Sequence, residues 1–365
     1  MSRAVFVRIL FAFFLVSTVT LFGCTRKLET VAPPNTETAK IEKKRREVNL
    51  SIWASYLSPE IKEEFTKKTG IEIHVSNYVS NEDLLAKVQA GGSGIDVCVP
   101  SDYMVDIMNK TGLLQPLELE KIPNRSGLDS AFLNQEFDLE NKFSLPYAWS
   151  TAGFAINREL FKGTINSWKD LFQNQELSGK ISLLDDVREV MAAGLKANGF
   201  SVNSTVMAEL EKAKVTLKEV RKRIKMYRSD SIDPLVNKEV AVAHAFSSDA
   251  LKAAEKTKGQ IVYILPEEGG TRAIDNLVIP KTAKNLREAH ELINFLLSKE
   301  ANVAFVKTMF GGPVVAATRN LLPPDLRTNA ALFPPPEILK KFESLRDVGH
   351  ATRHFDRIWT EIKAE

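Results

Sequence analysis

Hydrophobic and polar residues alternate in two short stretches near the start of the folded part of the chain. Val48 to Trp53 and Ile71 to Val75 both follow this pattern, which is typical of β-strands with one buried face. The stretch between them opens with the pair Ser58-Pro59 and closes at Gly70, which are signals of a helix start and a helix end. The pattern therefore predicts a strand, a helix and a second strand.

A second helix and a third strand follow in the same manner. Asn81 to Gln89 has helical spacing, and a glycine-rich loop leads from it to the apolar strand Ile95 to Pro100. Strands that alternate with helices at this spacing form right-handed βαβ units of a parallel sheet. The ends of the three strands, after Trp53, Val75 and Pro100, are expected along one edge, where ligands of open α/β sheets bind.

Two longer amphipathic helices are predicted farther along the chain. Apolar residues recur every three or four positions from Val206 to Ile224, and again from about Asn285 to Ser298. The first stretch is also rich in Lys and Arg, so a basic coiled coil or a nucleic-acid-binding helix is an alternative. Because its pattern lasts only about three heptads, it favours a surface helix that packs one stripe onto a domain.

The N-terminal segment has the features of a secretory signal. Arg3 and Arg8 precede an uncharged, mostly apolar run from Ile9 to Phe22, which is too short and wrongly flanked for a membrane span. The run ends in Leu21-Phe22-Gly23-Cys24, which resembles a bacterial lipobox, although Phe22 is bulkier than usual. Residues 1–23 would then be removed and Cys24 would carry a lipid such as palmitate. A plain signal peptide with an incidental cysteine is the alternative.

Residues 24–47 are predicted to be a flexible tether, since they are polar and charged and contain Pro33 and Pro34. The chain has 365 residues and a formal net charge of +3. Two basic residues lie in the leader, and the tether holds seven basic and four acidic residues, so Val48 to Glu365 carries a net charge of −2. This negative charge argues against a nucleic-acid partner. The basic residues Lys43 to Arg46 would instead lie near anionic lipid headgroups. Cys98 alone remains after Cys24, which excludes an internal disulfide.

The motifs of several enzyme classes are missing. The chain has no Walker phosphate loop, no Gly-x-Gly-x-x-Gly, no Gly-x-Ser-x-Gly elbow and no His-Glu-x-x-His. His350 and His354 are four residues apart but lack a distinctive set of further metal ligands. Cys98 lies inside an apolar strand and is interpreted as a buried small side chain. We therefore expect no catalytic residue, no metal and no cofactor.

Aromatic and acidic residues gather at the ends of predicted strands. They are Trp53, Tyr56, Ser101, Tyr103, Asp185, Asp186, Glu189, Phe246, Asp249 and Asp275. Each alone could be a rim residue, a core residue or a helix cap. Together, rings that contact methylene groups and carboxylates that accept ammonium hydrogen bonds would suit a flexible diammonium compound.

The order of motifs along the chain resembles the spermidine/putrescine-binding proteins of ATP-driven polyamine importers. The resemblance runs from about Leu50 to the C-terminal region. Its motifs include Trp53-Ala54-Ser55-Tyr56, the stretches Glu64 to Ile71 and Asp96 to Tyr103, Leu145 to Trp149, Asp185 to Val190, Pro266 to Gly270 and Ile293 to Leu297. It implies an α/β periplasmic-binding-protein fold, with two lobes joined by hinge crossovers near Gly153 to Asn157 and near Asp275. Lobe 1 would comprise residues 48–154 and 274–319, and lobe 2 residues 155–273 and 320–365.

The resemblance carries over to the pocket residue by residue. Ligand-binding positions of the family fall on Trp53, Tyr56, Ser101, Tyr103, Asp186, Glu189, Phe246, Asp249 and Asp275. Phe246 stands where the family usually has Trp, and Asp249 matches the putrescine-type members. Ala273 replaces an aromatic residue, Phe310-Gly311-Gly312 lacks a tyrosine, and Leu345 stands near an expected glutamine. Arg272 would repel a cation if it pointed inward, but strand alternation places it on the face opposite Asp275.

The resemblance implies a monomeric receptor on the periplasmic side of a bacterial membrane, held there through Cys24. It would bind putrescine or spermidine, with the short diamine favoured, and deliver the ligand to ABC permease subunits by closing its cleft. Two alternatives stay open at this point. The same fold could bind another amino compound, which an inward Arg272 would favour, or the chain could be a sensory or surface lipoprotein without a role in transport.

Overall fold

The computed structural model describes residues 45–54, 56–91 and 94–364. The predicted leader, Cys24 and nearly all of the predicted tether lie outside the described residues, as do Ser55 and part of the glycine loop after the second helix. Residues from Arg45 onward form one compact unit. The features below belong to that unit.

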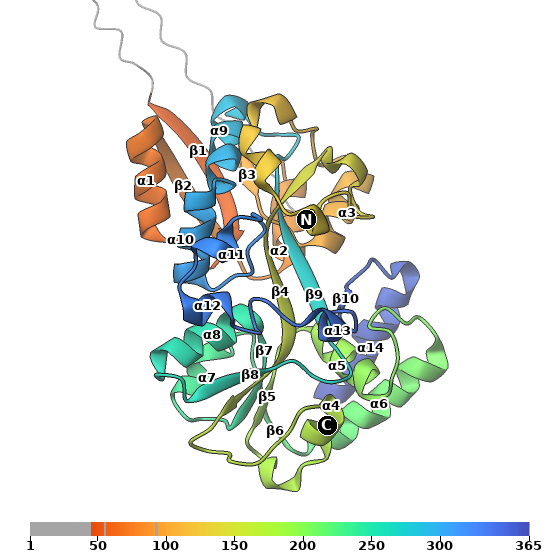
Figure 1. Cartoon of the computed structure of the whole chain (residues 1–365). Coiled ribbons are helices and arrows are strands. Elements are labelled where there is room, and N and C mark those ends of the chain that lie inside the picture. The colour runs from red at the N-terminus through yellow and green to blue at the C-terminus, as the bar shows by residue number, and fades with distance from the viewer. Residues whose placement is uncertain (1–44, 55, 92–93, 365) are drawn as a thin grey trace, which may run out of the picture. The chain divides into compact units, whose positions relative to one another are not determined.

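The unit is built on one curled mixed sheet (Figure 1). Its strands are β1 (Arg46–Trp53), β2 (Ile71–Tyr78), β3 (Val97–Cys98), β4 (Ser144–Asn157), β5 (Ile181–Leu183), β6 (Ile224–Tyr227), β7 (Val242–Phe246), β8 (Ile261–Ile264), β9 (Thr271–Val278) and β10 (Glu343–Ser344). The order is β2-β1-β3-β9-β4-β7-β5-β6, with β10 beside β9 and β8 beside β4. We call β2, β1 and β3 the first half of the sheet, and β7, β5 and β6 the second half.

Helices flank both halves of this sheet. They are α1 (Pro59–Thr69), α2 (Asn81–Gln89), α3 (Asp102–Lys110), α4 (Trp168–Gln173), α5 (Val187–Ala197), α6 (Met207–Arg221), α7 (Ile232–Val236), α8 (Ser247–Lys256), α9 (Leu286–Leu296), α10 (Lys299–Met309), α11 (Thr318–Leu321), α12 (Pro324–Arg327), α13 (Pro336–Leu339) and α14 (Thr352–Lys363). Figure 1 shows α1 and α9 beside the first half, and α4, α6 and α14 beside the second.

The predicted βαβ units are confirmed. β1 pairs in parallel with both β2 and β3, and β5 pairs in parallel with both β6 and β7. The first helix begins and ends where its residue types indicate, since the Ser58 hydroxyl accepts from the N–H of Ile61 and Gly70 adopts a left-handed φ of 70°.

β4 and β9 connect the two halves. They pair antiparallel with each other from Ser144 to Ala152, while β9 also contacts β3 of the first half. The later part of β4, up to Asn157, pairs with β7 and β8. Both predicted crossovers lie in these two strands, so the polar side chains of β9 lie between the halves.

Several boundaries differ from the sequence expectations. β2 continues past the expected end at Val75 to Tyr78, and β3 is limited to Val97–Cys98. β1 begins at Arg46, inside the predicted tether, because the Arg46 guanidinium is held by Glu288 and Glu291 of α9 at 2.9 and 2.5 Å. The helix expected from Val206 to Ile224 is shorter: Val206 is an exposed residue before α6, and Ile224 opens β6. Its apolar periodicity continued by chance into a strand.

The hydrophobic core is divided between the halves. One large cluster packs β1, β2 and α9 against residues of β4 and β9, including Ile52 and Leu292. A second packs β5, α5, α6 and α14 around Trp168. Leu322 and Leu332, which the family resemblance assigned to the second lobe, pack into the first cluster. Each half thus has a core of its own.

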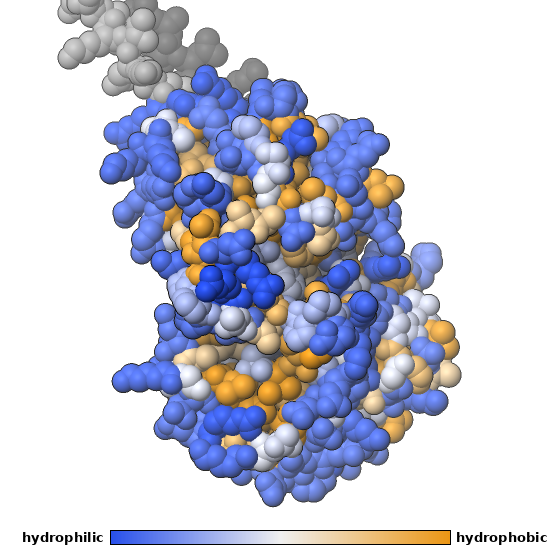
Figure 2. Space-filling model, viewed as in Figure 1, coloured by the Kyte–Doolittle hydropathy of each residue, from blue (hydrophilic) through white to orange (hydrophobic). Residues whose placement is uncertain are grey.

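The surface is mostly hydrophilic. Figure 2 shows hydrophobic residues at the surface over β8, where Val262 is 38% exposed. Within the described part of the chain, no helix is long and apolar enough to cross a membrane.

Candidate functional site

The carboxyl of Asp275 on β9 joins three segments that are far apart in the sequence. Its Oδ1 accepts a hydrogen bond from the Ser101 hydroxyl at 2.7 Å, and its Oδ2 accepts one from the Tyr56 hydroxyl at 3.0 Å. Asp275 is 5% exposed, and this burial raises its pKa to about 6. Both donors are neutral, so they orient the carboxylate without cancelling its charge.

Aromatic side chains surround Asp275 on the first half of the sheet. Trp53 packs edge-on against Tyr78, with their centroids 4.6 Å apart. The buried indole N–H of Trp53 meets no acceptor in full hydrogen-bond geometry, although it lies near enough to Asp275 to lower that carboxyl's pKa. Tyr56 packs against Phe305 and Tyr147, and the Tyr147 hydroxyl donates to the Tyr56 carbonyl at 2.9 Å. Tyr56 is therefore fixed in place.

Two further carboxyls, those of Asp186 and Glu189, lie at the N-terminus of α5. The Asp186 carboxylate caps this helix by accepting from the N–H groups of Arg188 and Glu189, while Asp186 itself stays exposed to solvent. Glu189 is 5% exposed and accepts from the Thr271 hydroxyl at 2.7 Å. Burial and the nearby Asp186 charge raise the pKa of Glu189 to about 8. The surrounding protein also raises the pKa of Asp186 by removing water from part of its carboxyl, although the residue as a whole keeps an exposed surface.

His244 of β7 lies behind Glu189 but supplies no positive charge. Its Nε2 is 3.9 Å from Glu189 Oε2, and its ring packs edge-on against Trp168. Burial lowers the pKa of His244 to about 3, so it is neutral at physiological pH. Glu189 therefore has no cationic partner in His244.

Tyr103 belongs to a small network at the rim of the first half. Its hydroxyl donates to Glu82 Oε1 at 3.0 Å and accepts from the Asn81 amide at 3.1 Å. The Asn81 side chain also accepts from the N–H of Ser101 at 3.1 Å, which couples Tyr103 to the residue that holds Asp275. The Glu82 charge raises the pKa of Asp186, so these two acids from opposite halves lie near each other.

Phe246 and Asp249 lie where β7 passes into α8. Phe246 is half-buried and pairs with Ala152 of β4. Asp249 differs from Asp275 because it has a basic neighbour, with Lys252 Nζ 3.7 Å from its Oδ1. The Asp249 charge also raises the pKa of Tyr56, so it lies near the Asp275 group. These contacts bring the predicted residues of both halves into one region.

The sequence reasoning passed over several residues that the structure places in this region. They are Asn81, Glu82, Asp102, His244 and Thr271. Asp102 is 2% exposed, and its Oδ2 has no hydrogen-bond partner among the described residues. Its position between Ser101 and Tyr103, both of which were selected, was the available signal. Asp102 could have been predicted as a site residue because it lies at a strand end between two selected polar residues, Ser101 and Tyr103.

The departures from the family pattern have a physical basis at Gly311 and Gly312. A Cβ atom on Gly311 would lie 2.3 Å from the Phe305 ring, and one on Gly312 would lie 2.5 Å from Trp149 Nε1. Existing rings therefore occupy the space that a side chain would need here. Along β9, Thr271 and Asp275 lie on one face of the strand, by the alternation of side chains. Arg272 lies on the opposite face, together with Ile274.

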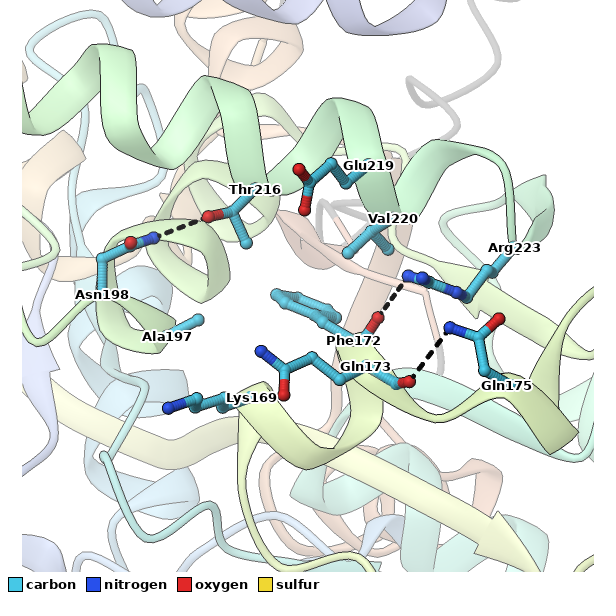
Figure 3. Close-up of a pocket in the computed structure, with 10 residues that line it drawn as sticks. All are labelled: Lys169, Phe172, Gln173, Gln175, Ala197, Asn198, Thr216, Glu219, Val220 and Arg223. Carbon is cyan, nitrogen blue, oxygen red and sulfur yellow. Dashed lines mark hydrogen bonds between the residues drawn. The ribbon is translucent and has the colours of Figure 1, made fainter.

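A surface hollow of about 320 Å³ lies elsewhere on the second half (Figure 3). It is lined by residues of α4, α6 and the C-terminal end of α5, which is the end opposite Asp186. Lys169 and Arg223 line it together with a single acid, Glu219, and the Arg223 guanidinium donates to the Phe172 carbonyl. This lining does not suit a cation, so the acidic region at β9 is the stronger candidate site.

Among the described residues, no group of three or more His, Cys, Asp or Glu side chains has the arrangement of a metal site. His350 and His354 are therefore not part of such a group. Cys98 is fully buried, and its burial raises its thiol pKa, as expected for an inert core residue.

Residues 60–334 match the family of bacterial extracellular solute-binding proteins. The chain belongs to this family. Among the relatives of this solute-binding protein is the spermidine/putrescine-binding periplasmic protein of Escherichia coli, which is 35% identical over 86% of this chain and 90% of its own length. The predicted resemblance to spermidine/putrescine-binding proteins is thereby confirmed.

Solved structures agree on the fold of this solute-binding protein. The spermidine/putrescine ABC transporter substrate-binding protein PotD of Streptococcus pneumoniae has a TM-score of 0.79 and 31% identity, covering 87% of this chain and 99% of its own. A lipoprotein of Treponema pallidum has a TM-score of 0.78 and 26% identity, covering 87% of this chain and all (100%) of its own. The expected α/β periplasmic-binding-protein fold is confirmed.

Proposed function

We propose that this solute-binding protein is a polyamine receptor that delivers its ligand to ABC permease subunits. The observation that carries the proposal is the buried Asp275 carboxylate, which two neutral hydroxyls hold and which makes no ion pair with Lys or Arg within the described ranges. A buried carboxylate without a counter-charge is costly and favours a ligand that brings a positive charge. The relatives named as spermidine/putrescine-binding proteins support the same ligand class.

The arrangement supports a ligand with positive charges at both ends. Asp275 and Asp249 flank Tyr56, while Glu189 and Asp186 lie at the start of α5. The rings of Trp53, Tyr103 and Phe246 would contact the methylene chain between them. Ser101 and Tyr56 would keep Asp275 oriented while its outer lone pairs receive the ammonium hydrogens.

The two halves of the sheet would act as the two lobes of the receptor, with β4 and β9 as the hinge. Lobe 1 would contain residues 48–154 and 274–319 and lobe 2 the remainder, with the segment around Leu322 and Leu332 packed on lobe 1. Ligand binding would draw α5 toward α2 and α3, because it neutralises the acids that face each other there. The closed receptor would act as a monomer and present both lobes to the permease, and no chemical step would occur in this chain.

Calorimetric titration of residues 45–365 with putrescine, spermidine and spermine tests this function. We expect saturable binding at one site per chain, with the diamine bound at least as tightly as the longer amines because Asp249 matches the putrescine-type members of the family. Amino acids added as competitors provide the matched negative control. Displacement of putrescine by an amino acid would instead favour a receptor for zwitterions, and absence of binding to every amine would favour a sensory or surface role.

The Lys252→Met variant tests the part of Asp249. Lys252 is half-buried and is the basic group nearest to Asp249, so it should compete with a ligand ammonium for that carboxylate. We expect the variant to bind putrescine roughly three- to tenfold more tightly, because about 1 kcal/mol of competing ion pairing is removed. Lys256→Met, on the exposed end of the same helix, should leave the affinity unchanged. Equal affinities in the two variants would remove Asp249 from the site.

We also propose that Cys24 is acylated and anchors the receptor on the periplasmic side of a bacterial membrane. The lipobox-like motif Leu21-Phe22-Gly23-Cys24 supports this, as does the tether that follows it. In cells, Cys24→Ser should move the protein from the membrane fraction to the soluble fraction. Protein that stays in the membrane fraction would contradict the anchor and leave the receptor function in place.

A further inference from the structure

Asp102 lies where the first half of the sheet meets the C-terminal segment. It is the first residue of α3, directly after Ser101, whose backbone bridges to Asp275 of β9. Farther along β9, Ser344 of β10 pairs with Arg272. The Asp102 carboxyl lies near the Ser344 hydroxyl and the backbone N–H of Ile274, both of which favour its ionised form. Asp102 therefore belongs to one of the segments beside β9 and lies close to the other, which is β10.

The bonding of this carboxyl is incomplete. Asp102 Oδ1 accepts from the N–H of Tyr103 at 2.9 Å, but Oδ2 is buried without a partner that meets hydrogen-bond geometry. An ionised carboxylate whose buried oxygen lacks a well-aligned hydrogen-bond donor is unfavourable. A protonated carboxyl carries no such charge penalty, so burial shifts Asp102 toward its acid form.

The groups that face Asp102 do not neutralise it. On β9 these are Asp275 and, on the other strand side, Arg272, which makes no ion pair with Asp102 within the described residues. On α5 they are Glu189 and Arg188, and the Arg188 guanidinium is bound to the Arg346 carbonyl and Asn203. On α3 and β10 they are the neutral Tyr103 and Ser344, while Glu343 is bound to Lys196.

Three buried carboxyls thus lie in one region, and none of them forms an ion pair with Lys or Arg among the described residues, although the Arg188 charge lowers the pKa of Glu189. Burial and the Asp275 charge raise the pKa of Asp102 to about 7, and the Asp102 charge in turn helps to raise that of Glu189. The charges of Asp275 and Asp102 each disfavour ionisation of a neighbouring carboxyl, so the group retains part of its protons near neutral pH when no ligand is bound. An ammonium group that enters would favour the ionised forms and displace those protons.

We propose that Asp102 is a positioning residue that exchanges its proton for the ligand's positive charge and, once ionised, binds Ser344 and Ile274 more tightly so that the hinge closes. This inference rests on the proposed function. It adds that polyamine capture is coupled to proton release at a carboxyl that need not touch the ligand. The hinge then responds to charge in the site.

The sign of the pH dependence follows from these groups. Their pKa values are raised in the empty receptor, to about 6 for Asp275, about 7 for Asp102 and about 8 for Glu189, and a bound ammonium lowers them. Binding therefore releases protons, and affinity should rise with pH between about 6 and 8. It should level off above that range, until the ligand amines lose their own protons.

The Asp102→Asn variant separates the proton released by Asp102 from the protons released by Asp275 and Glu189. Calorimetric titration with putrescine in two buffers of different ionisation enthalpy measures the number of protons released on binding. Because a group with a pKa of about 7 is half protonated at pH 7, the variant should release about half a proton fewer than wild type there. Its gain in affinity from about pH 6 to pH 8 should be about tenfold smaller. Asp106→Asn, on the exposed side of the same helix and paired with Lys110, should match wild type.

Two further measurements keep the test independent of folding or binding defects. Ser344→Ala removes a hydroxyl that favours ionised Asp102, so its affinity profile should shift to higher pH. In the empty receptor, the Asp102 carboxyl ¹³C resonance, identified by its loss in Asp102→Asn, should titrate near pH 7. Normal binding with an unchanged proton count in Asp102→Asn, or a resonance that titrates at an ordinary aspartate pH, would overturn the exchange alone. Wild-type protein that binds no polyamine would overturn the receptor function as well.

Discussion

Asp275→Ala is expected to weaken polyamine binding by about 2–5 kcal/mol, which is roughly a thirtyfold to several-thousandfold rise in Kd. The loss is large because the ligand ammonium would be buried without its counter-charge, and because the Ser101 and Tyr56 hydroxyls would lose their shared acceptor. Calorimetric titration with putrescine measures the change. Asp325→Ala, at an exposed position on α12, is the control and should bind normally.

Asp275→Asn distinguishes lost charge from lost shape. The amide keeps the size of the carboxyl and one oxygen acceptor, so most of the affinity should still be lost if charge is the cause. The empty protein should tolerate this change at pH 7. Burial raises the folded-state pKa of Asp275 to about 6, so its ionised form destabilises the empty fold as pH rises past the ordinary aspartate value. Unchanged affinity in either variant would remove Asp275 from the binding site.

Trp168→Ala is expected to cost about 3–5 kcal/mol of unfolding free energy. Trp168 is 1% exposed, packs against Phe154 and His244, and donates its indole N–H to the Gly269 carbonyl at 2.9 Å. Its removal would leave a cavity in the second core and an unpaired carbonyl beneath it. Urea denaturation followed by circular dichroism measures the loss.

Trp359→Ala supplies a matched comparison for this variant. Trp359 lies on α14, is half-buried and packs edge-on against Tyr227, so its removal should cost clearly less than that of Trp168. A Trp168→Ala protein as stable as Trp359→Ala would mean that the second core repacks around the missing ring. Since Trp168 also backs His244 and Glu189, its loss should reduce ligand binding through the wall of the site.

The local sequence signals predicted the parallel units well. Ser58, Pro59 and Gly70 act within one turn of the helix ends they mark, so their effect does not depend on the rest of the fold. The limits of α6 were harder to predict. Ile224 continues the apolar spacing of the helix, but its pairing with Ile181 of β5 places it in a strand. Sheet pairing across 43 positions of chain overrides the local pattern here.

The site was predicted where a residue's own neighbours indicate a strand end, and missed where only the folded chain brings groups together. Asp275 and Ser101 are 174 positions apart, yet each follows or lies on an apolar strand and could be selected. Thr271 and His244 matter because they contact Glu189 from other strands, and nothing in their local sequence shows this. The sequence shows that Asp102 is an acid beside two site residues, but it does not show that its Oδ2 is buried without a hydrogen-bond partner among the described residues.

The pairing of β3 with β9 also affects how the chain folds. Cys98 of β3 lies opposite Val278 of β9, so the first half of the sheet cannot be completed until 180 further positions have been synthesised. Contacts between residues so distant in sequence slow folding, because a long loop must close before the pairing is rewarded. A newly made chain should therefore fold slowly, and only after β9 has been synthesised. The strand that carries Asp275 thus also determines when the first half of the sheet can be completed.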